Sequence, residues 1–542
     1  MATPSLAMVA SAYADSKLYS VLPNNGDGDF TFNRDSAATR IGSNGLIQTV
    51  GFFGNDLIIN GDFSTDSDWI KGGGWSIEGG VAVCNGTQTG STTLRQDGTY
   101  TNGVKYKITY TITVTAGAVE VRFQGGGTSV GGASQITGGT YTEYLVSTGN
   151  TSVRFVSNTD YIGTVDNISV EEVLGDQPRL NYDLNANGEP SSCPSFLMEK
   201  ETTNLSVFSQ NFYRGAWAKT NATITADATT SPDGLINADK ITDDTTDGQH
   251  RVSDSFAVID AKNYTMSVFV KYVEGSDIDK MHLFAATSTP TTRAYFDIKN
   301  GVALTGGGTI QNYGNGWYRV SMGVTANATG NILFGINLAK ADDDATYSGT
   351  GNGQMFIWGA QSEINVVQTT VYAYASSYVP TEEAVQSRAA ETCFDGGTAN
   401  TFNNLEGTLY AEIAANANDA SFRSINLNSG DATNRVTIRY RSNINAINFR
   451  IEANDISVYS GTFYVTSALD FHKCAMTYKS GDIRIFIDGV IQVTNTTAFT
   501  DLTINRLNFD SGGNTNKFRG KCKDLRVYNE ALTNAQLIAL TQ

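Results

Sequence analysis

The sequence NDLIINGDF at residues 55–63 is followed by Trp69, and the sequence TNLSVFSQNF at residues 203–212 is followed by Trp217 at nearly the same offset. Each copy contains an Asn before an apolar run and ends on a Phe that precedes the Trp. A segment long enough to form one module follows each copy. This repetition predicts serial β-sandwich modules.

The composition is typical of an all-β protein. The 542 residues include 55 Gly, only 8 Pro, 25 Tyr and 26 Phe, a balance that indicates many short strands joined by glycine- and asparagine-containing turns. A chain of this length is too long for one hydrophobic core, so three or four domains are expected. The sequence therefore predicts an all-β fold of serial jelly-roll β-sandwich domains in which helix is scarce.

The formal net charge is −17. The sequence has no stripe of Lys and Arg that could displace the counterions of a phosphate backbone, so a nucleic-acid-binding protein is not expected. We interpret the acidic excess as a source of solubility.

The five cysteines include no CxxC pair and are predicted to be buried single thiols of a protein assembled in a reducing cytoplasm. They are Cys84, Cys193, Cys393, Cys474 and Cys522. Cys474 and Cys522 fall on two predicted strands of one module, so a disulfide between them is an alternative. The apolar run at residues 6–10 is short for a secretory signal and no Lys or Arg precedes it. Since no stretch is apolar enough to span a membrane, we expect neither secretion nor membrane insertion.

Alternation of apolar and polar residues marks two antiparallel sandwiches. In residues 51–175 it covers 106–114, 119–123, 152–156 and 165–170. In residues 204–373 it covers 264–270, 294–298, 316–322, 331–336 and 354–358. The second module is expected to have the larger core.

The C-terminal segment has further strand patterns at 407–413, 435–440 and 471–478. Residues 482–490 predict a hairpin with Asp488-Gly489 as its turn, and Thr533 is placed to cap one short terminal helix. Residues 374–392 contain Pro380 and are predicted to be an extended connector.

Residues 393–542 resemble the concanavalin A-like, laminin G-like lectin fold. The strand at 471–478, the FIDGV hairpin at 486–490 and the closing stretch at 518–533 follow the order and spacing of that family. Residues 51–175 resemble a jelly-roll carbohydrate-binding module, because NGDF at the opening and VDNISV at the close match that family. Both resemblances imply folds of the sugar-binding type.

The N-terminal segment resembles a framework of bacteriophage virion and tail-associated proteins. The pieces that carry this resemblance are RDSAATRI at 34–41, PRLNYD at 178–183, CPSFLME at 193–199 and TNL at 203–205. In that family the first piece runs almost directly into the second, whereas a complete module separates them in this chain. The resemblance implies that residues 51–175 are an inserted domain and that the attachment framework is discontinuous.

The predicted organisation has five parts. They are a virion-attachment framework (1–50, continued by 176–203), an inserted jelly-roll module (51–175), a second jelly-roll module (204–373), a connector (374–392) and a concanavalin A-like domain (393–542).

Sugar-binding jelly rolls stack aromatic side chains on pyranose rings. The candidates for this role are Trp69, Trp75 and Trp217. Trp69 and Trp217 occupy equivalent positions in the repeat, which also suits a shared role in the core. Trp75 directly follows Gly72-Gly73-Gly74 and is expected to be the more exposed candidate.

Related jelly rolls hold a structural calcium ion between the opening loop and the closing strand. Asp166 matches the acidic position of the closing strand. Ser64 replaces the usual Glu of the opening loop, which leaves Asp62 or backbone carbonyl groups as ligands. Asp62 and Asp166 are therefore the candidate metal ligands, and calcium is the candidate cofactor.

Motifs for catalysis are scarce. The three histidines, His250, His282 and His472, are scattered, and the sequence has no nucleophile elbow, zinc-protease motif or P-loop. Glycosidases of the concanavalin A-like fold need paired acids along one strand, whereas Glu412 stands alone in its strand. The sequence predicts a non-enzymatic protein, with a polysaccharide depolymerase as an alternative.

The phage resemblance implies a virion structural protein, either a tail fibre or a capsid decoration, assembled in the host cytoplasm. Its framework is expected to bind other virion proteins, and its modules to bind host cell-surface glycans with avidity from many copies. Nucleic acid is not an expected partner. A homo-oligomer is expected, with a trimer as the common state of such fibres, and a structural spacer without ligand is the alternative.

Overall fold

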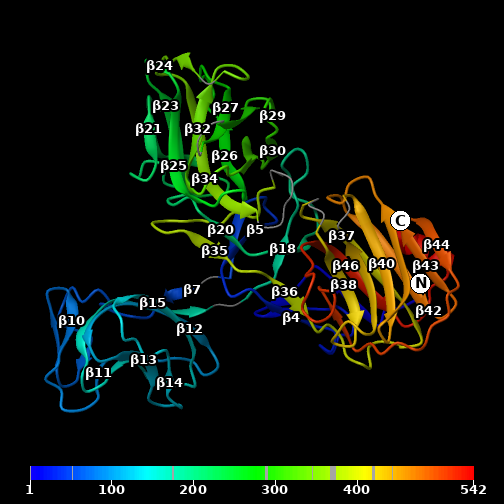
Figure 1. Ribbon diagram of the computed structural model, residues 1–542, viewed down its shortest axis with the longest axis horizontal. Helices are drawn as coiled ribbons and strands as arrows, with labels where there is room; N and C mark the ends of the chain where they lie inside the picture. Colours follow the sequence, from blue (N-terminus) through cyan, green and yellow to red (C-terminus); the bar gives the residue numbers. More distant parts are fainter. Residues whose placement is uncertain are drawn as a thin grey trace. The chain divides into compact units, whose positions relative to one another are not determined.

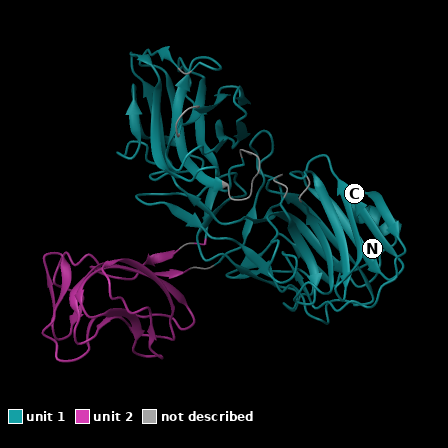
Figure 2. Cartoon of the chain, viewed as in Figure 1, with its two compact units in different colours: residues 1–50, 176–542 teal, residues 51–175 magenta. Residues whose placement is uncertain are grey.

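The computed structural model describes residues 2–51, 53–173, 176–286, 291–344, 346–365, 374–417, 421–441 and 444–542. These residues form many short strands and one helix, α1 (Asn534–Thr541), which confirms the predicted all-β fold of serial sandwiches. The chain divides into two compact units, residues 51–175 and residues 1–50 with 176–542 (Figure 2). Among the described residues, no helix has the length and hydropathy needed to cross a membrane.

The unit of residues 51–175 is a two-layer sandwich with its own core (Figure 1). One sheet has the order β15 (Gly139–Val146), β12 (Lys105–Ala116), β17 (Ile162–Val173), β10 (Val81–Asn85) and β9 (Trp75–Glu78), with β7 (Phe53–Asp56) also paired to β17. The other sheet has the order β14 (Val130–Gly131), β13 (Val119–Gln124), β16 (Ser152–Ser157), β11 (Thr92–Asp97) and β8 (Ile70–Lys71). Strict alternation in β12 and β13 puts one apolar face of each sheet into this core.

A second sandwich follows within the larger unit. Its first sheet has the order β21 (Ala218–Thr220), β25 (His250–Val258), β32 (Gly330–Ala339), β27 (Lys280–Ala286), β28 (Thr292–Asp297) and β29 (Val302–Ala303). Its second sheet has the order β22 (Ala222–Thr230), β23 (Ile236–Asp243), β34 (Gln354–Asn365), β26 (Asn263–Tyr272), β31 (Trp317–Thr325) and β30 (Thr309–Asn312). The short strands β24 (Asp247–Gly248) and β33 (Tyr347–Ser348) pair beside it.

The C-terminal sandwich combines an eight-stranded and a five-stranded sheet. The larger has the order β18 (Arg179–Asn181), β19 (Ser195–Met198), β46 (Gly520–Tyr528), β37 (Glu406–Ala415), β42 (His472–Lys479), β43 (Ile483–Ile487) and β44 (Val490–Asn495), with β1 (Leu6–Val9) also on β46. The smaller has the order β41 (Ile456–Tyr464), β40 (Ala446–Ala453), β39 (Arg435–Tyr440), β38 (Arg423–Asn428) and β45 (Arg506–Asn508). Three short sheets complete the unit. The first has the order β2 (Tyr13–Ala14), β3 (Lys17–Leu18), β4 (Phe30–Asn33) and β36 (Thr392–Phe394). The other two are the pair β5 (Ala38–Ile41) and β6 (Ile47–Val50) and the pair β20 (Thr202–Asn204) and β35 (Gln386–Arg388).

Two local predictions for the C-terminal segment are confirmed. Asp488 and Gly489 connect β43 to β44 with φ angles of 49° and 77°, the left-handed pair that a type I′ hairpin turn requires. Thr533 caps α1 and forms a capping box with Gln536.

Strands of the framework join a sheet of the C-terminal sandwich. β1 and β19 lie along the same edge of β46, where Leu6 pairs with Val527 and Phe196 pairs with Cys522. Without them the last strand of the C-terminal sandwich would expose unpaired backbone groups to solvent. Phe196 also packs against Phe509, at 5.3 Å between ring centroids, so framework and sandwich share one core.

A buried cluster of ions joins the framework to the connector. Arg179 is fully buried and donates from Nε to Glu391 Oε1 at 2.8 Å and from Nη1 to Glu199 Oε2 at 2.8 Å. Arg34 donates to Glu391 Oε1 at 2.9 Å, and Arg388 lies 3.1 Å from Glu199 Oε2. Burial opposes ionisation of Glu391, but Arg179 and the other arginines outweigh it and hold its pKa below the ordinary value. We call these five side chains the clasp.

The thiols in the C-terminal sandwich are unpaired in the structure. Cys474 on β42 and Cys522 on β46 lie on opposite sides of β37, opposite Ala411 and Ile413 respectively. Burial raises the pKa of both thiols well above the ordinary value. The alternative of a disulfide between them is therefore not supported, because a whole strand separates them.

We predict that Arg179→Met lowers the free energy of unfolding of the larger unit by about 3–5 kcal/mol, since it leaves Glu199 and Glu391 buried without their main counter-ion. Denaturant unfolding followed by circular dichroism measures this loss. The control is Lys479→Met, whose ion pair with Glu406 is largely exposed and contributes at most about 1 kcal/mol. Equal stability of the two variants would contradict the role given to the clasp.

Candidate functional site

The face of the five-stranded sheet that is turned away from the core of the C-terminal sandwich is lined mainly by polar side chains, several of them fully buried. Along β39, Val436, Ile438 and Tyr440 enter the core, so Arg435 and Arg439 project from the opposite face. The same alternation in β38, β40 and β41 extends this polar face. Its cross-strand rows are Asn426–Thr437–Arg450–Ser460, Ser424–Arg439–Asn448–Thr462 and Asn428–Arg435–Glu452.

Arginine predominates among the charged groups of this polar face. Glu452 accepts hydrogen bonds from Arg435 Nε and Arg450 Nη2. Arg439 is only 9% exposed, donates to Asn448 Oδ1 at 2.8 Å and makes no ion pair with any described residue. Burial, with help from the neighbouring arginines, lowers the pKa of Arg439 to about 10, which still leaves it charged at neutral pH.

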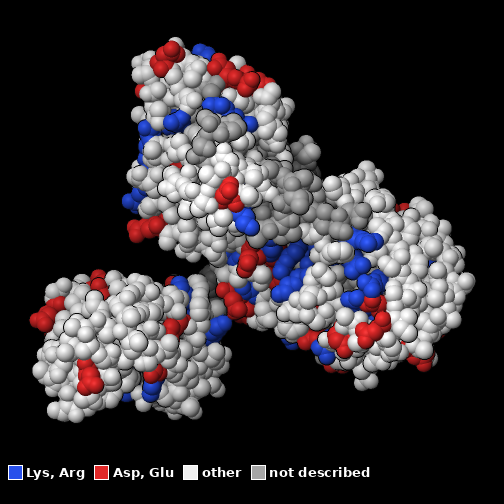
Figure 3. Space-filling model, in the orientation of Figure 1, with Lys and Arg blue, Asp and Glu red and all other residues white. Residues whose placement is uncertain are grey.

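The polar face is cationic although the chain is acidic. Residues 393–542 contain 14 Lys and Arg and 14 Asp and Glu, so the whole net charge of −17 lies in residues 1–392. Figure 3 shows Lys and Arg side chains gathered over the strands of the C-terminal sandwich. A cationic face of this kind attracts acidic or hydroxyl-rich ligands.

The polar face also offers unused hydrogen-bonding groups. The side-chain nitrogen of Asn426 and the hydroxyl of Ser424 are buried and have no partner among the residues that the structure describes. Phe422 is 37% exposed and lies under the Arg439 guanidinium at 5.1 Å, and Tyr464 at the end of β41 is 70% exposed. Amide, guanidinium and hydroxyl donors beside exposed aromatic rings suit a sugar ligand.

The sequence predictions did not include this polar face. The signal was present in the alternation of Arg and apolar residues along RVTIRYR at 435–441. It becomes informative only once the strand register places those arginines beside Asn448, Arg450 and Glu452.

Trp69 and Trp217 take equivalent places in the cores of their two modules. Trp69 is 6% exposed, packs on Phe63 at 5.3 Å and donates from its indole to the carbonyl of Asn60 at 3.1 Å. Trp217 is 1% exposed, packs on Phe212 at 4.7 Å and donates to the carbonyl of Val207 at 3.1 Å. The repeat therefore keeps a Phe–Trp pair that ties each opening loop to its core.

Trp75 is buried, which corrects the expectation that it is exposed. It is 7% exposed and packs against Tyr161 at 5.9 Å. The preceding glycines suggested an open loop, but Trp75 begins β9 and pairs with Cys84 of β10, which turns its ring inward. As packed, none of the three tryptophans offers a ring face to a sugar.

The backbone segments that carry the candidate calcium ligands Asp62 and Asp166 are adjacent, but each carboxylate accepts a hydrogen bond from a backbone N–H close to it in sequence. The carbonyl of Gly61 accepts from Ile168 N at 3.0 Å, so the opening loop and closing strand are adjacent. Asp62 accepts from Ser64 N at 3.3 Å, and Asp166 accepts from Asn167 N at 2.7 Å. No cluster of three or more Asp, Glu, His or Cys with metal-site geometry occurs among the described residues. Calcium at Asp62 and Asp166 stays a prediction.

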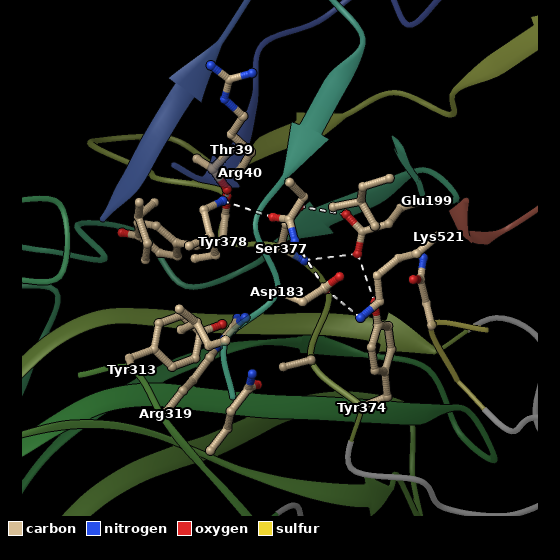
Figure 4. Close-up of a pocket in the computed structure, with 18 of the residues that line it drawn as sticks. Thr39, Arg40, Asp183, Glu199, Tyr313, Arg319, Tyr374, Ser377, Tyr378 and Lys521 are labelled. Carbon is tan, nitrogen blue, oxygen red and sulfur yellow. Dashed lines mark hydrogen bonds and ion pairs between the residues drawn. The ribbon is translucent and has the colours of Figure 1, made fainter. Parts of the chain in front are cut away.

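A cavity of about 300 Å³ lies within the larger unit, where framework residues meet both of its sandwiches (Figure 4). Its charged walls are largely paired with each other. Asp183 accepts from Lys521 at 2.6 Å, Glu199 accepts from the Tyr374 hydroxyl at 2.9 Å, and Arg319 donates to the carbonyl of Ser376 at 2.6 Å. We interpret this cavity as part of a structural joint beside the clasp.

The structure places one acidic neighbour beside Glu412 that the sequence prediction missed. Asp524 of β46 is the cross-strand partner of Glu412, and Lys473 of β42 flanks it on the other side. Asp524 accepts two hydrogen bonds from Arg526, at 2.9 and 2.6 Å. All three histidines are buried, and burial lowers the pKa of His282 to about 3, so this side chain is neutral at physiological pH.

Comparison with known proteins supports the C-terminal fold. Residues 393–538 match the family model described as the concanavalin A-like lectin/glucanases superfamily. No curated protein sequence matches the chain.

Several solved structures match parts of the chain at low identity and low TM-score. The CBM40 module of the Ruminococcus gnavus IT-sialidase is 14% identical over 28% of this chain and 91% of that chain, with a TM-score of 0.24. The CBM22 tandem of Paenibacillus barcinonensis Xyn10C is 11% identical over 58% and 98%, with a TM-score of 0.28. Domains LG4-5 of the mouse laminin α1 chain are 10% identical over 59% and 92%, with a TM-score of 0.19. Scores this low say nothing about ligands, whereas the family match identifies residues 393–538 as a concanavalin A-like, laminin G-like domain.

Proposed function

We propose that this chain is a non-enzymatic structural protein of a bacteriophage virion, a fibre or surface decoration that presents β-sandwich modules to host-surface glycans. The observation that supports glycan binding best is the polar face of the concanavalin A-like domain, with its buried Arg439 and the side-chain nitrogen of Asn426, which has no partner among the described residues. The framework, which resembles that of phage virion proteins, would bind other virion proteins. Many copies on one particle would convert weak sugar contacts into firm attachment.

The proposal is non-enzymatic because the most suggestive acid pair is poorly arranged for hydrolysis. A glycosidase needs one carboxyl group free to give up a proton and another to act on the sugar. Both oxygens of Asp524 accept hydrogen bonds from Arg526, so neither is free to act on a sugar. Tyr410, two residues before Glu412 on the same strand face, packs with Leu537 and Leu540 of α1, so helix residues cover this region of the sheet.

The first test is binding of the full chain to an array of bacterial surface glycans. Arg439→Gln is predicted to weaken binding at least tenfold, the loss expected for one charge-assisted hydrogen bond. Lys479→Gln, on the other sheet, removes the same charge and is predicted to leave binding unchanged. Binding to no glycan would contradict the attachment role and favour a structural spacer. Release of oligosaccharides from host capsule would instead show a depolymerase.

A second test separates core tryptophans from sugar platforms. Trp75→Ala is predicted to destabilise the unit of residues 51–175 by about 3–5 kcal/mol, because it empties a buried site. Below the unfolding temperature, the same variant is predicted to bind the array like the unmodified chain. A stable variant that lost glycan binding would restore Trp75 as a sugar platform.

A further inference from the structure

The three arginines of residues 51–175 stand in a single row. Arg95 on β11 pairs with Arg154 on β16, and Arg154 pairs with Arg122 on β13. The unit contains no other arginine. Neighbouring strands lie about 4.8 Å apart, so the row extends about 10 Å across the sheet. We call these three side chains the arginine row.

The arginine row lies on the solvent side of its sheet. Its neighbours along the strands, Leu94, Phe155 and Val121, are fully buried in the core of the unit, so the arginines project the other way. The side chains of Arg95 and Arg122 are 34% and 33% exposed. The row continues at the Arg95 end with Ile70, whose side chain is 48% exposed.

Only the outer two arginines have acidic partners. Arg122 donates to Glu120 Oε2 at 2.8 Å, and Arg95 lies 3.5 Å from Asp97. The central Arg154 donates from Nε to the hydroxyl of Ser152 at 2.8 Å, and no described acid pairs with it.

Fold stability does not account for the arginine row. Like charges directly opposite each other on neighbouring strands destabilise a sheet. Solubility does not account for it either, because the unit carries 12 Asp and Glu against 6 Lys and Arg and is already acidic. Arg154, which lies between two other arginines and has no described acidic partner, is therefore best explained by an anionic ligand that neutralises it.

The surroundings of the row favour one class of ligand. A guanidinium recognises a carboxylate through two parallel hydrogen bonds, and Arg154 has nitrogens free for such a pair. The acidic excess of the unit opposes the long-range attraction on which nucleic acids and anionic membranes depend. A carboxylated polysaccharide offers the carboxylates for this pairing, and its ring carbons can contact Ile70 and Val156 on the same face.

We propose that the arginine row is a binding site for an acidic polysaccharide that carries carboxylate groups, with Arg154 as its central contact. The inference rests on the proposed function, because it names the glycan class that one of the displayed modules binds. It is independent of the polar face of the concanavalin A-like domain, since the two sites belong to different units.

The test measures binding of the full chain to immobilised polygalacturonate, polysialate, neutral dextran and single-stranded DNA at low salt. At least one carboxylated polysaccharide is expected to bind more tightly than dextran or DNA. Arg154→Gln is expected to weaken that binding at least tenfold. Lys105→Gln, which removes one positive charge from the other sheet of the same unit, is expected to change it less than twofold. Thermal unfolding of Arg154→Gln is expected to match or exceed that of the unmodified chain, because the substitution removes like-charge repulsion.

The outcomes separate this inference from the proposed function. If Arg154→Gln and Lys105→Gln weaken binding to the carboxylated polysaccharide equally, the arginine row is not the binding site. Binding to neutral dextran alone overturns the inference too and leaves the attachment role intact. Tighter binding to DNA than to either polysaccharide overturns the ligand class. If no carboxylated polysaccharide binds and the wider glycan array is also blank, both the inference and the proposed function fail.

Discussion

The larger unit of this protein depends on the ion pairs of Arg179. This side chain is fully buried, and its guanidinium contacts Glu199 of the framework and Glu391 of the connector. A buried charge is costly unless its partners are complete, so Arg179 is stable only when residues far apart in the sequence meet. Such a cluster adds little to the net free energy of folding. An arrangement that leaves one of its charges buried without a partner is, however, strongly disfavoured.

This constraint changes how the framework relates to the modules. The sequence predicted a discontinuous attachment framework, residues 1–50 and 176–203, as a part distinct from the sandwiches. In the structure, β1 and β19 of the framework complete the last strand of the concanavalin A-like domain, and Phe196 shares its core. The framework and the polar face with Arg439 therefore belong to one folded body. The unit of residues 51–175, which has its own sheets and core, could carry a different glycan site without disturbing that body.

Local patterns predicted most of the strands but few of the sites. Alternation predicted the sandwiches, and Asp488-Gly489 predicted a hairpin that the structure confirms. The pairing of Leu6 with Val527 has no local signal, because the two residues are separated by almost the whole chain. The arginine row could not be found either, since a strand register shifted by one residue would turn Arg154 into the core. Trp75 was misjudged because composition indicated a loop where β9 begins.

Hydrogen exchange of the intact protein, followed by mass spectrometry, tests most directly whether framework and concanavalin A-like domain form one body. Peptides that cover β1, β19 and β37 report on the two framework strands and on the centre of the sheet. The account predicts that all three exchange together, with the protection of the most stable part of the larger unit. Exchange of β1 and β19 many times faster than β37 would show that the framework is only loosely attached, and would contradict the account.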